Sequence, residues 1–193
     1  MDDLDDVRAY LGYDRINLYG GSYGTRAALV YMRQHGAHVR SAVLDSVAPT
    51  DMRLPLYTAR DAQRALDALL ADCEKDSRCH QTYPDVRDRV TALFRRLAAR
   101  PVHTRLVHPR TGVAEDIDVD ARFVATVMFG ALYSPLTASI LPQLLDRAER
   151  DDFQGLLALG LAGSGEQNVS VGMQLSVLCS EDYPRVTPAD LSQ

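Results

Sequence analysis

The sequence predicts an α/β fold in which a short β-α-β unit is followed by a mostly helical region. Two observations lead to this prediction. A strand pattern, a glycine-rich turn and a helix pattern follow one another between residues 15 and 35, and a second apolar strand comes after them. The strand pattern then stops near Thr50, and residues 51–175 show mainly the spacing of amphipathic helices.

The first fifty residues contain four predicted elements. A short amphipathic helix at residues 4–11 has aspartates crowded at its N-terminal end, which suits the helix dipole, and Gly12 closes it. Residues 15–19 (RINLY) predict a buried strand, residues 25–35 a helix that ends at Gly36, and Val39–Asp45 a second strand. A β-α-β unit of this length predicts that the two strands are parallel neighbours.

The turn between the first strand and its helix is Gly20-Gly21-Ser22-Tyr23-Gly24, a G-x-S-x-G sequence. On a strand-to-helix turn this motif is typical of a nucleophile elbow, in which a strained serine, here Ser22, is lifted clear of the sheet. Gly20 and Gly24 let the two backbones pass closely, and the backbone N–H of Tyr23 can face a developing oxyanion. The alternative is a glycine-rich turn with a capping serine.

The helical region is expected to hold helices at residues 59–72, 83–99, 121–132, 142–150 and 153–161. Asp120 and Asp152 are candidate N-caps. One β-hairpin is predicted between the second and third of these helices, with strands at residues 102–107 and 113–119. Residues 160–165 (GLAGSG) predict a flexible loop.

The cysteines leave two interpretations open. Cys73 and Cys79 bracket CEKDSRC, which is predicted to be a short polar loop at the end of a helix. A disulfide there indicates an exported protein, whereas two free thiols indicate a cytosolic one. The spacing does not suit a C-x-x-C zinc or redox pair, and the sequence predicts no metal ion and no cofactor. Cys179 is left over.

Composition excludes several classes of partner. The chain of 193 residues carries 26 Asp and Glu against 21 Lys and Arg, without a basic stripe, which argues against a nucleic-acid partner. No apolar run approaches the ~20 residues of a membrane span. No signal peptide is expected, because aspartates and then a helix follow Met1.

Residues 3–49, DLDDVRAYLGYDRINLYGGSYGTRAALVYMRQHGAHVRSAVLDSVAP, resemble the elbow region of α/β-hydrolase-fold exopeptidases, in particular the proline iminopeptidase and tripeptidyl aminopeptidase-like family. The resemblance is close over roughly the first fifty residues and holds only in outline beyond them. It implies a partial α/β-hydrolase core at residues 1–50, a helical lid at 51–175 and a return segment toward the core at 176–193. It also implies a serine peptidase that releases residues or short peptides from peptide N-termini through an acyl-enzyme.

Such a serine needs a histidine base and an acid that orients the base. His35 and His38 lie at the far end of the helix that starts at the elbow, some 15 Å or more away, and His80, His103 and His108 belong to the predicted lid. We therefore expect the chain to be one part of a hydrolase, inactive by itself. Its two strands are expected to expose an edge through which the chain associates with itself.

Three acids are candidate site residues with alternatives. Asp45, at the end of the second strand, is either the triad acid or part of the strand-to-lid turn. In the resembling family, acids at the lid or its hinge hold the substrate's α-amino group, and Glu181 and Asp182 match them in position and type. Otherwise this pair forms a solvated acidic turn before Pro184.

Three functions remain open. The partner is a peptide if the chain is part of an aminopeptidase, and a small acyl substrate if it is part of an esterase or lipase on the same fold, because G-x-S-x-G does not separate the two. The third is a non-catalytic lid or binding module that keeps the elbow only as scaffold.

Overall fold

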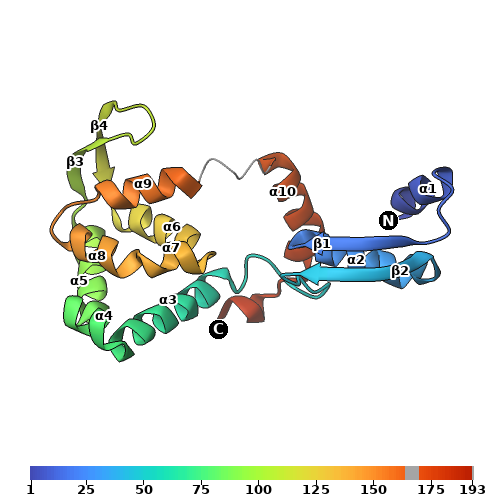
Figure 1. Cartoon of the computed structure of the whole chain (residues 1–193), viewed down its shortest axis with the longest axis horizontal. Coiled ribbons are helices and arrows are strands. Elements are labelled where there is room, and N and C mark those ends of the chain that lie inside the picture. The colour runs from blue at the N-terminus through green and yellow to red at the C-terminus, as the bar shows by residue number, and fades with distance from the viewer. Residues whose placement is uncertain (164–169, 193) are drawn as a thin grey trace. The chain divides into compact units, whose positions relative to one another are not determined.

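The computed structural model describes residues 1–163 and 170–192, and the chain divides into two compact units (Figure 1). The first unit consists of Met1–Leu54 together with Val177–Gln193, and the second of Pro55–Ser176. Within the described residues, no helix is long and apolar enough to cross a membrane.

The first unit contains the predicted β-α-β arrangement. Its elements before residue 54 are α1 (Asp2–Tyr10), β1 (Ile16–Gly21), α2 (Tyr23–His35), the 3₁₀ turn η1 (Gly36–His38) and β2 (Val39–Asp45). The two strands pair in parallel, from Ile16 opposite Val39 to Gly21 opposite Asp45, which confirms the prediction. Strand β1 ends two residues later than predicted, because Gly20 and Gly21 still pair with β2. Helix α2 begins two residues earlier than predicted, so the turn between them consists of Ser22 alone.

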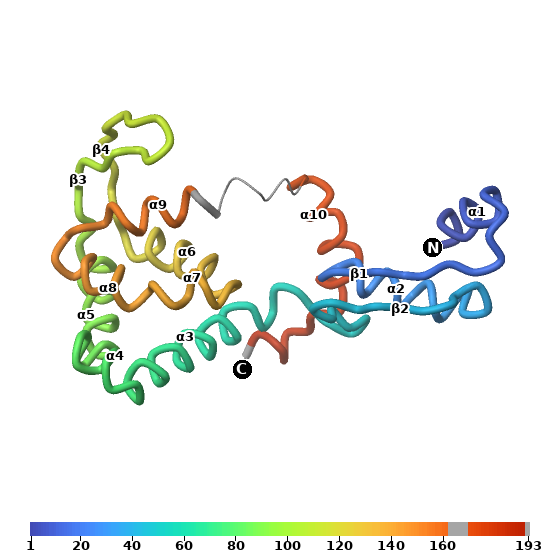
Figure 2. The backbone as a smooth tube through the Cα atoms, viewed as in Figure 1, coloured from blue at the N-terminus to red at the C-terminus, as the bar shows by residue number. Residues whose placement is uncertain are grey.

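Helix α2 packs on one face of the two strands (Figure 2). Residues of β1 alternate accordingly: Ile16, Leu18 and Gly20 are shielded, while the residues between them are exposed, Tyr19 to 75%. Val43 of β2 is 57% exposed. The first unit therefore presents much of its small sheet to solvent.

The C-terminal residues return to the first unit as three short helical turns: the π-turn η2 (Leu178–Asp182) and the 3₁₀ turns η3 (Tyr183–Arg185) and η4 (Pro188–Ser192). The guanidinium of Arg185 donates to the carbonyl oxygens of Thr50 at 2.5 Å and Met52 at 3.0 Å. These bonds fix the segment beside the chain that leaves β2.

The second unit is a helical unit with one hairpin. Its elements are α3 (Thr58–Lys75), α4 (Ser77–Thr82), α5 (Val86–Ala99), β3 (Val102–Val107), β4 (Ala114–Val119), α6 (Ala121–Ala131), α7 (Pro135–Ser139), α8 (Leu141–Glu149) and α9 (Gln154–Gly163), and α10 (Val171–Val177) spans its boundary with the first unit. The antiparallel pairing of β3 with β4 confirms the predicted hairpin. Fully buried residues such as Leu97, Leu141 and Phe153 form the core. Asp120 caps α6 as predicted, accepting from the backbone N–H of Phe123 at 2.7 Å.

Three boundaries in this unit differ from prediction. The helix expected at residues 83–99 begins only at Val86, since Asp85 takes a left-handed conformation (φ 52°) after Pro84, and the short helix α4, which was not predicted, ends before it at Thr82. Helix α7 is missed because it is only five residues long. The loop expected at residues 160–165 is helical through Gly163, and residues 164 and 165 lie outside the described residues.

The glycines of α9 explain why the loop prediction was wrong. A Cβ on Gly160 would lie 3.0 Å from Cγ2 of Val127 in α6, and one on Gly155 would lie 2.6 Å from Cδ2 of Leu144 in α8. Glycine at these positions lets the helices approach closely. Here it serves packing rather than flexibility.

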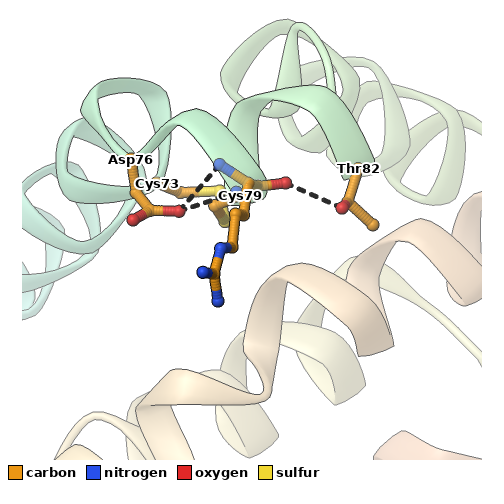
Figure 3. Close-up of a disulfide and its surroundings, with 5 residues drawn as sticks. Cys73, Asp76, Cys79 and Thr82 are labelled. Atoms are coloured by element: carbon orange, nitrogen blue, oxygen red, sulfur yellow. Dashed lines mark hydrogen bonds between the residues drawn. A yellow bond between two sulfur atoms is a disulfide. The ribbon is translucent and has the colours of Figure 1, made fainter.

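Cys73 in α3 and Cys79 in α4 form a disulfide, with Cα atoms 5.1 Å apart (Figure 3). The segment between them is helical on both sides of Asp76, not a polar loop as predicted. The carboxylate of Asp76 accepts from the backbone N–H groups of Arg78 at 3.0 Å and Cys79 at 2.8 Å, so it caps α4 (Figure 3). Cys179 is exposed and unbridged.

Candidate active site

Ser22 occupies a sharp turn between β1 and α2. Its backbone angles are φ 51° and ψ −118°, a region that non-glycine residues rarely enter. Backbone atoms hold the turn: Ser22 N–H donates to the carbonyl oxygen of Asp45 at 3.0 Å, and Ser22 C=O accepts from Thr25 N–H at 3.0 Å and from Thr25 Oγ1 at 2.6 Å. Ser22 is exposed, and the turn is fixed without its hydroxyl. The conformation predicted for this residue is confirmed.

Gly20 is required by close approach of the two backbones. A Cβ at this position would lie 2.5 Å from the carbonyl oxygen of Gly24 and 2.8 Å from the backbone nitrogen of Thr25. The corresponding positions on Gly21 and Gly24 point into open space. Of the three motif glycines, only Gly20 is one where any side chain would strike the helix.

Tyr23 carries two polar groups that point to different partners. It is the first residue of α2, so its backbone N–H has no acceptor within the helix and is available to an anion. Its phenol donates to Oε1 of Glu181 at 2.8 Å. Partial burial, followed by this hydrogen bond to a carboxylate, raises the pKa of the Tyr23 phenol, which therefore stays protonated near neutral pH.

Arg26, one turn further along α2, is the polar centre of this region and was missed at the sequence level. Its side chain is almost fully buried, and Nη1 contacts Oε2 of Glu181 at 3.3 Å and Oδ1 of Asp182 at 3.0 Å. Arg185 also reaches Asp182 Oδ1, at 3.2 Å. Among the described residues, Arg26 Nε and Asp182 Oδ2 are buried without a hydrogen-bond partner. The only sequence signal was a charged residue inside the apolar stretch of α2.

The two acids, Glu181 and Asp182, therefore differ in their exposure to solvent. Asp182 is 1% exposed, so the solvated-turn alternative is wrong for this residue, whereas the side chain of Glu181 is 39% exposed. Glu181 lines an open cleft of about 520 Å³ within the first unit. The other lining residues are Arg26, Val30, Arg33, Thr50, Asp51 and Arg185.

Asp45 lies at the end of β2, opposite Gly21. Its carboxylate accepts from the hydroxyls of Ser46 at 3.1 Å and Tyr19 at 3.4 Å, and it is exposed. Its backbone carbonyl is the group that holds Ser22 N–H. The structure thus brings Asp45 beside the elbow through its main chain, and its role as an acid stays a prediction.

The two histidines of the first unit contact aspartates of α1 rather than Ser22. His35 ends α2, a helix of 13 residues and so about 20 Å long, which puts it far from Ser22. Its Nε2 lies 3.0 Å from Asp2 Oδ1, and His38 Nδ1 lies 2.7 Å from Asp5 Oδ1. In the second unit, His103 pairs with Asp118 at 2.8 Å.

Asp5, His35 and His38 lie close enough together to be metal ligands. Both oxygens of Asp5, however, already accept from the Arg8 guanidinium, and Oδ1 also accepts from the Tyr31 hydroxyl at 2.8 Å. A cation in direct contact with the carboxylate opposes a second one. The cluster is better described as a hydrogen-bonded contact that fastens α1 to α2.

The chain was compared with known protein families and proteins. The family model of the α/β hydrolase fold matches residues 1–108. Relatives named serine protease Hip1, from Mycobacterium bovis and two strains of Mycobacterium tuberculosis, are 29% identical over 203 aligned positions, which cover 97% of this chain. The chain spans 38% of the length of these relatives.

Proposed function

Because this chain belongs to the α/β-hydrolase fold family, we propose that it is part of a serine peptidase in which Ser22 is the nucleophile. The observation that carries the proposal is the sharp turn at Ser22, with its positive φ of 51°, followed directly by the free N-terminal N–H of α2. Attack by Ser22 on the scissile carbonyl would break the C–N bond and form an acyl-enzyme, with the serine proton passing through the general base to the departing amine, and Tyr23 N–H would stabilise the oxyanion. The similarity to a serine protease supports peptide substrates over other acyl compounds.

The complete site needs a general base, and neither histidine described in the first unit lies beside Ser22, since His35 ends α2 and His38 ends the turn η1 that follows it. We place the histidine outside this chain, with Asp45 as the acid or as part of the turn. The second unit (Pro55–Ser176) would act as the lid that excludes water and selects substrates. Residues 1–193 alone are then expected to be inactive.

An aminopeptidase is the more specific proposal, because Glu181 offers an accessible carboxylate tied to the residue after the nucleophile. Such a group suits a protonated α-amine. The esterase alternative has no comparable observation in its favour, since an ester needs no ammonium subsite.

The test compares the full-length protein that carries this chain with its Ser22→Ala variant. Aminoacyl- and tripeptidyl-nitroanilides and a chromogenic acyl ester serve as substrates. The proposal predicts Ser22-dependent hydrolysis of the nitroanilides. Turnover of the ester alone would favour an esterase, and no Ser22-dependent turnover of any substrate would favour a non-catalytic module.

A further inference from the structure

Thr25 is a fully buried polar residue in the first turn of α2. Its Oγ1 donates to the carbonyl oxygen of Ser22 at 2.6 Å and accepts from the backbone N–H of Ala48 at 2.8 Å. A hydroxyl has one donor and two acceptor sites, so both bonds can form at the same time. One side chain thus joins the turn at Ser22 to the chain that follows β2.

The carbonyl that Thr25 holds belongs to the same peptide group as the backbone N–H of Tyr23. A peptide group is planar and almost always trans, so its N–H points in the direction opposite to its C=O. The backbone N–H of Thr25 also donates to the Ser22 carbonyl, at 3.0 Å, so two donors fix this C=O toward the body of α2. Tyr23 N–H is therefore fixed in the opposite direction, out of the helix N-terminus. Because this N–H is the proposed oxyanion donor, the Thr25 hydroxyl helps to set its direction.

The peptide group on the other side of Ser22 is held by the same stretch of chain. Ser22 N–H donates to the carbonyl oxygen of Asp45 at 3.0 Å. Asp45 ends β2, and Ala48 follows it across Ser46, which also has a positive φ of 59°. Both peptide groups of Ser22 are therefore anchored to residues 45–48, one directly and the other through Thr25. A strained residue keeps its conformation only where its surroundings impose it, and these hydrogen bonds supply that constraint.

We propose that Thr25 is a positioning residue of the candidate active site. Its hydroxyl aims Tyr23 N–H at the reacting carbonyl and ties this donor to Ala48, in the chain that leads from β2 toward the second unit. This inference rests on the proposed peptidase function. The oxyanion forms only as the serine adds to the carbonyl, so a misdirected donor weakens binding of the transition state more than binding of the substrate. Loss of the hydroxyl should therefore lower kcat and leave KM nearly unchanged.

The test measures kcat and KM of the full-length protein on a peptide nitroanilide. Thr25→Val keeps the shape of the side chain without its hydroxyl and is expected to lower kcat about ten- to a hundredfold, less than complete removal of an oxyanion donor. KM should change by less than about twofold. Thr25→Ser keeps the hydroxyl without the methyl group and should retain kcat to within about threefold.

Ser41→Ala is the matched control. The Ser41 hydroxyl in β2 donates to Asn17 Oδ1 in β1 at 2.9 Å, so it joins the same two strands without contacting the peptide groups of Ser22. Its loss should leave kcat unchanged. Melting temperatures show which variants fold, and Thr25→Ala is the second hydroxyl-free variant if Thr25→Val does not fold.

Two results would overturn the inference while leaving the peptidase function intact. One is an unchanged kcat in the hydroxyl-free variant. The other is an equal loss of kcat in Thr25→Ser, which would show that packing of the methyl group is what matters. Absence of Ser22-dependent turnover already in the unsubstituted protein would instead remove the proposed function, and the inference with it.

Discussion

At the scale of single residues, the turn at Ser22 depends on Gly20. Ser22 itself adopts a strained conformation, and such strain persists only where the surroundings impose it. Gly20 allows those surroundings to exist, because β1 and α2 come so close there that backbone atoms of Gly24 and Thr25 occupy the space of a side chain.

Gly20→Ala is therefore expected to destabilise the first unit by about 1–3 kcal/mol, since the overlap is with backbone atoms that cannot move aside. Guanidinium unfolding followed by circular dichroism measures the effect. Gly21→Ala is the control, because a Cβ there meets nothing within 4 Å. Equal losses in both variants would show that the close approach at Gly20 is not what matters.

Residues differ in how far the sequence could predict them. Ser22 was predictable because its motif reports a backbone conformation that few residues adopt. Arg26 was not, since its partners Glu181 and Asp182 follow some 155 positions later and no local pattern links them. The burial of Asp182 has the same origin: it follows from Arg26 and Arg185, not from its own neighbours in sequence.

At the scale of elements, the carboxylate of Asp5 joins α1 to α2, beside the contact of Asp2 with His35. Asp5 accepts from Arg8, Tyr31 and His38, which come from α1, α2 and η1. The hydrogen bond from Arg8, followed by those from Tyr31 and His38, holds the pKa of the Asp5 carboxyl far below its usual range.

A depressed pKa in the folded state stabilises the fold above the unfolded pKa of about 3.9. This contribution is fully present near neutral pH and is lost as the pH falls below about 4. Amide exchange in α1 should therefore speed up in acid relative to that in β1. In Asp5→Asn the exchange should already be fast at pH 7, whereas Asp6→Asn, an exposed neighbour, should behave like the unsubstituted chain.

The disulfide joins α3 to α4 across a separation of six residues. Closing so short a loop is expected to stabilise the second unit by about 2 kcal/mol. The double variant Cys73→Ser, Cys79→Ser should lose that amount in denaturant unfolding, and Cys179→Ser should lose little. Thiol titration under denaturing, non-reducing conditions should find one thiol per chain, and finding three would contradict the bond and the prediction of an exported protein that rests on it.

Element types were predicted more reliably than element ends. Apolar spacing gave β1, β2, the hairpin and most helices, because these segments bury one face. The break at Pro84 and Asp85 depends on one left-handed residue, and the continuation of α9 depends on Val127 and Leu144 in other helices. Local patterns do not carry such tertiary contacts.

At the scale of the whole molecule, the two-stranded sheet of the first unit is small and largely exposed. Sheets of two strands are marginal in water, and open edges favour pairing with another chain. We predict that residues 1–193 associate with themselves in a concentration-dependent way, as measured by sedimentation velocity. Val43→Lys in β2 should weaken the association, while Val113→Lys, a similarly exposed valine in the hairpin turn, should not. A monomer at all concentrations would contradict the prediction.

The central claim is that Ser22 is the nucleophile of a serine hydrolase whose base lies outside residues 1–193. The most direct measurement is labelling by a fluorophosphonate probe at neutral pH, with the modified residue located by mass spectrometry in the full-length protein and in residues 1–193. We predict one label per full-length protein, at Ser22, none in its Ser22→Ala variant and none in residues 1–193. Stoichiometric labelling of Ser22 in residues 1–193 would reveal a base within this chain, and an unlabelled Ser22 in the full-length protein would contradict its role as nucleophile.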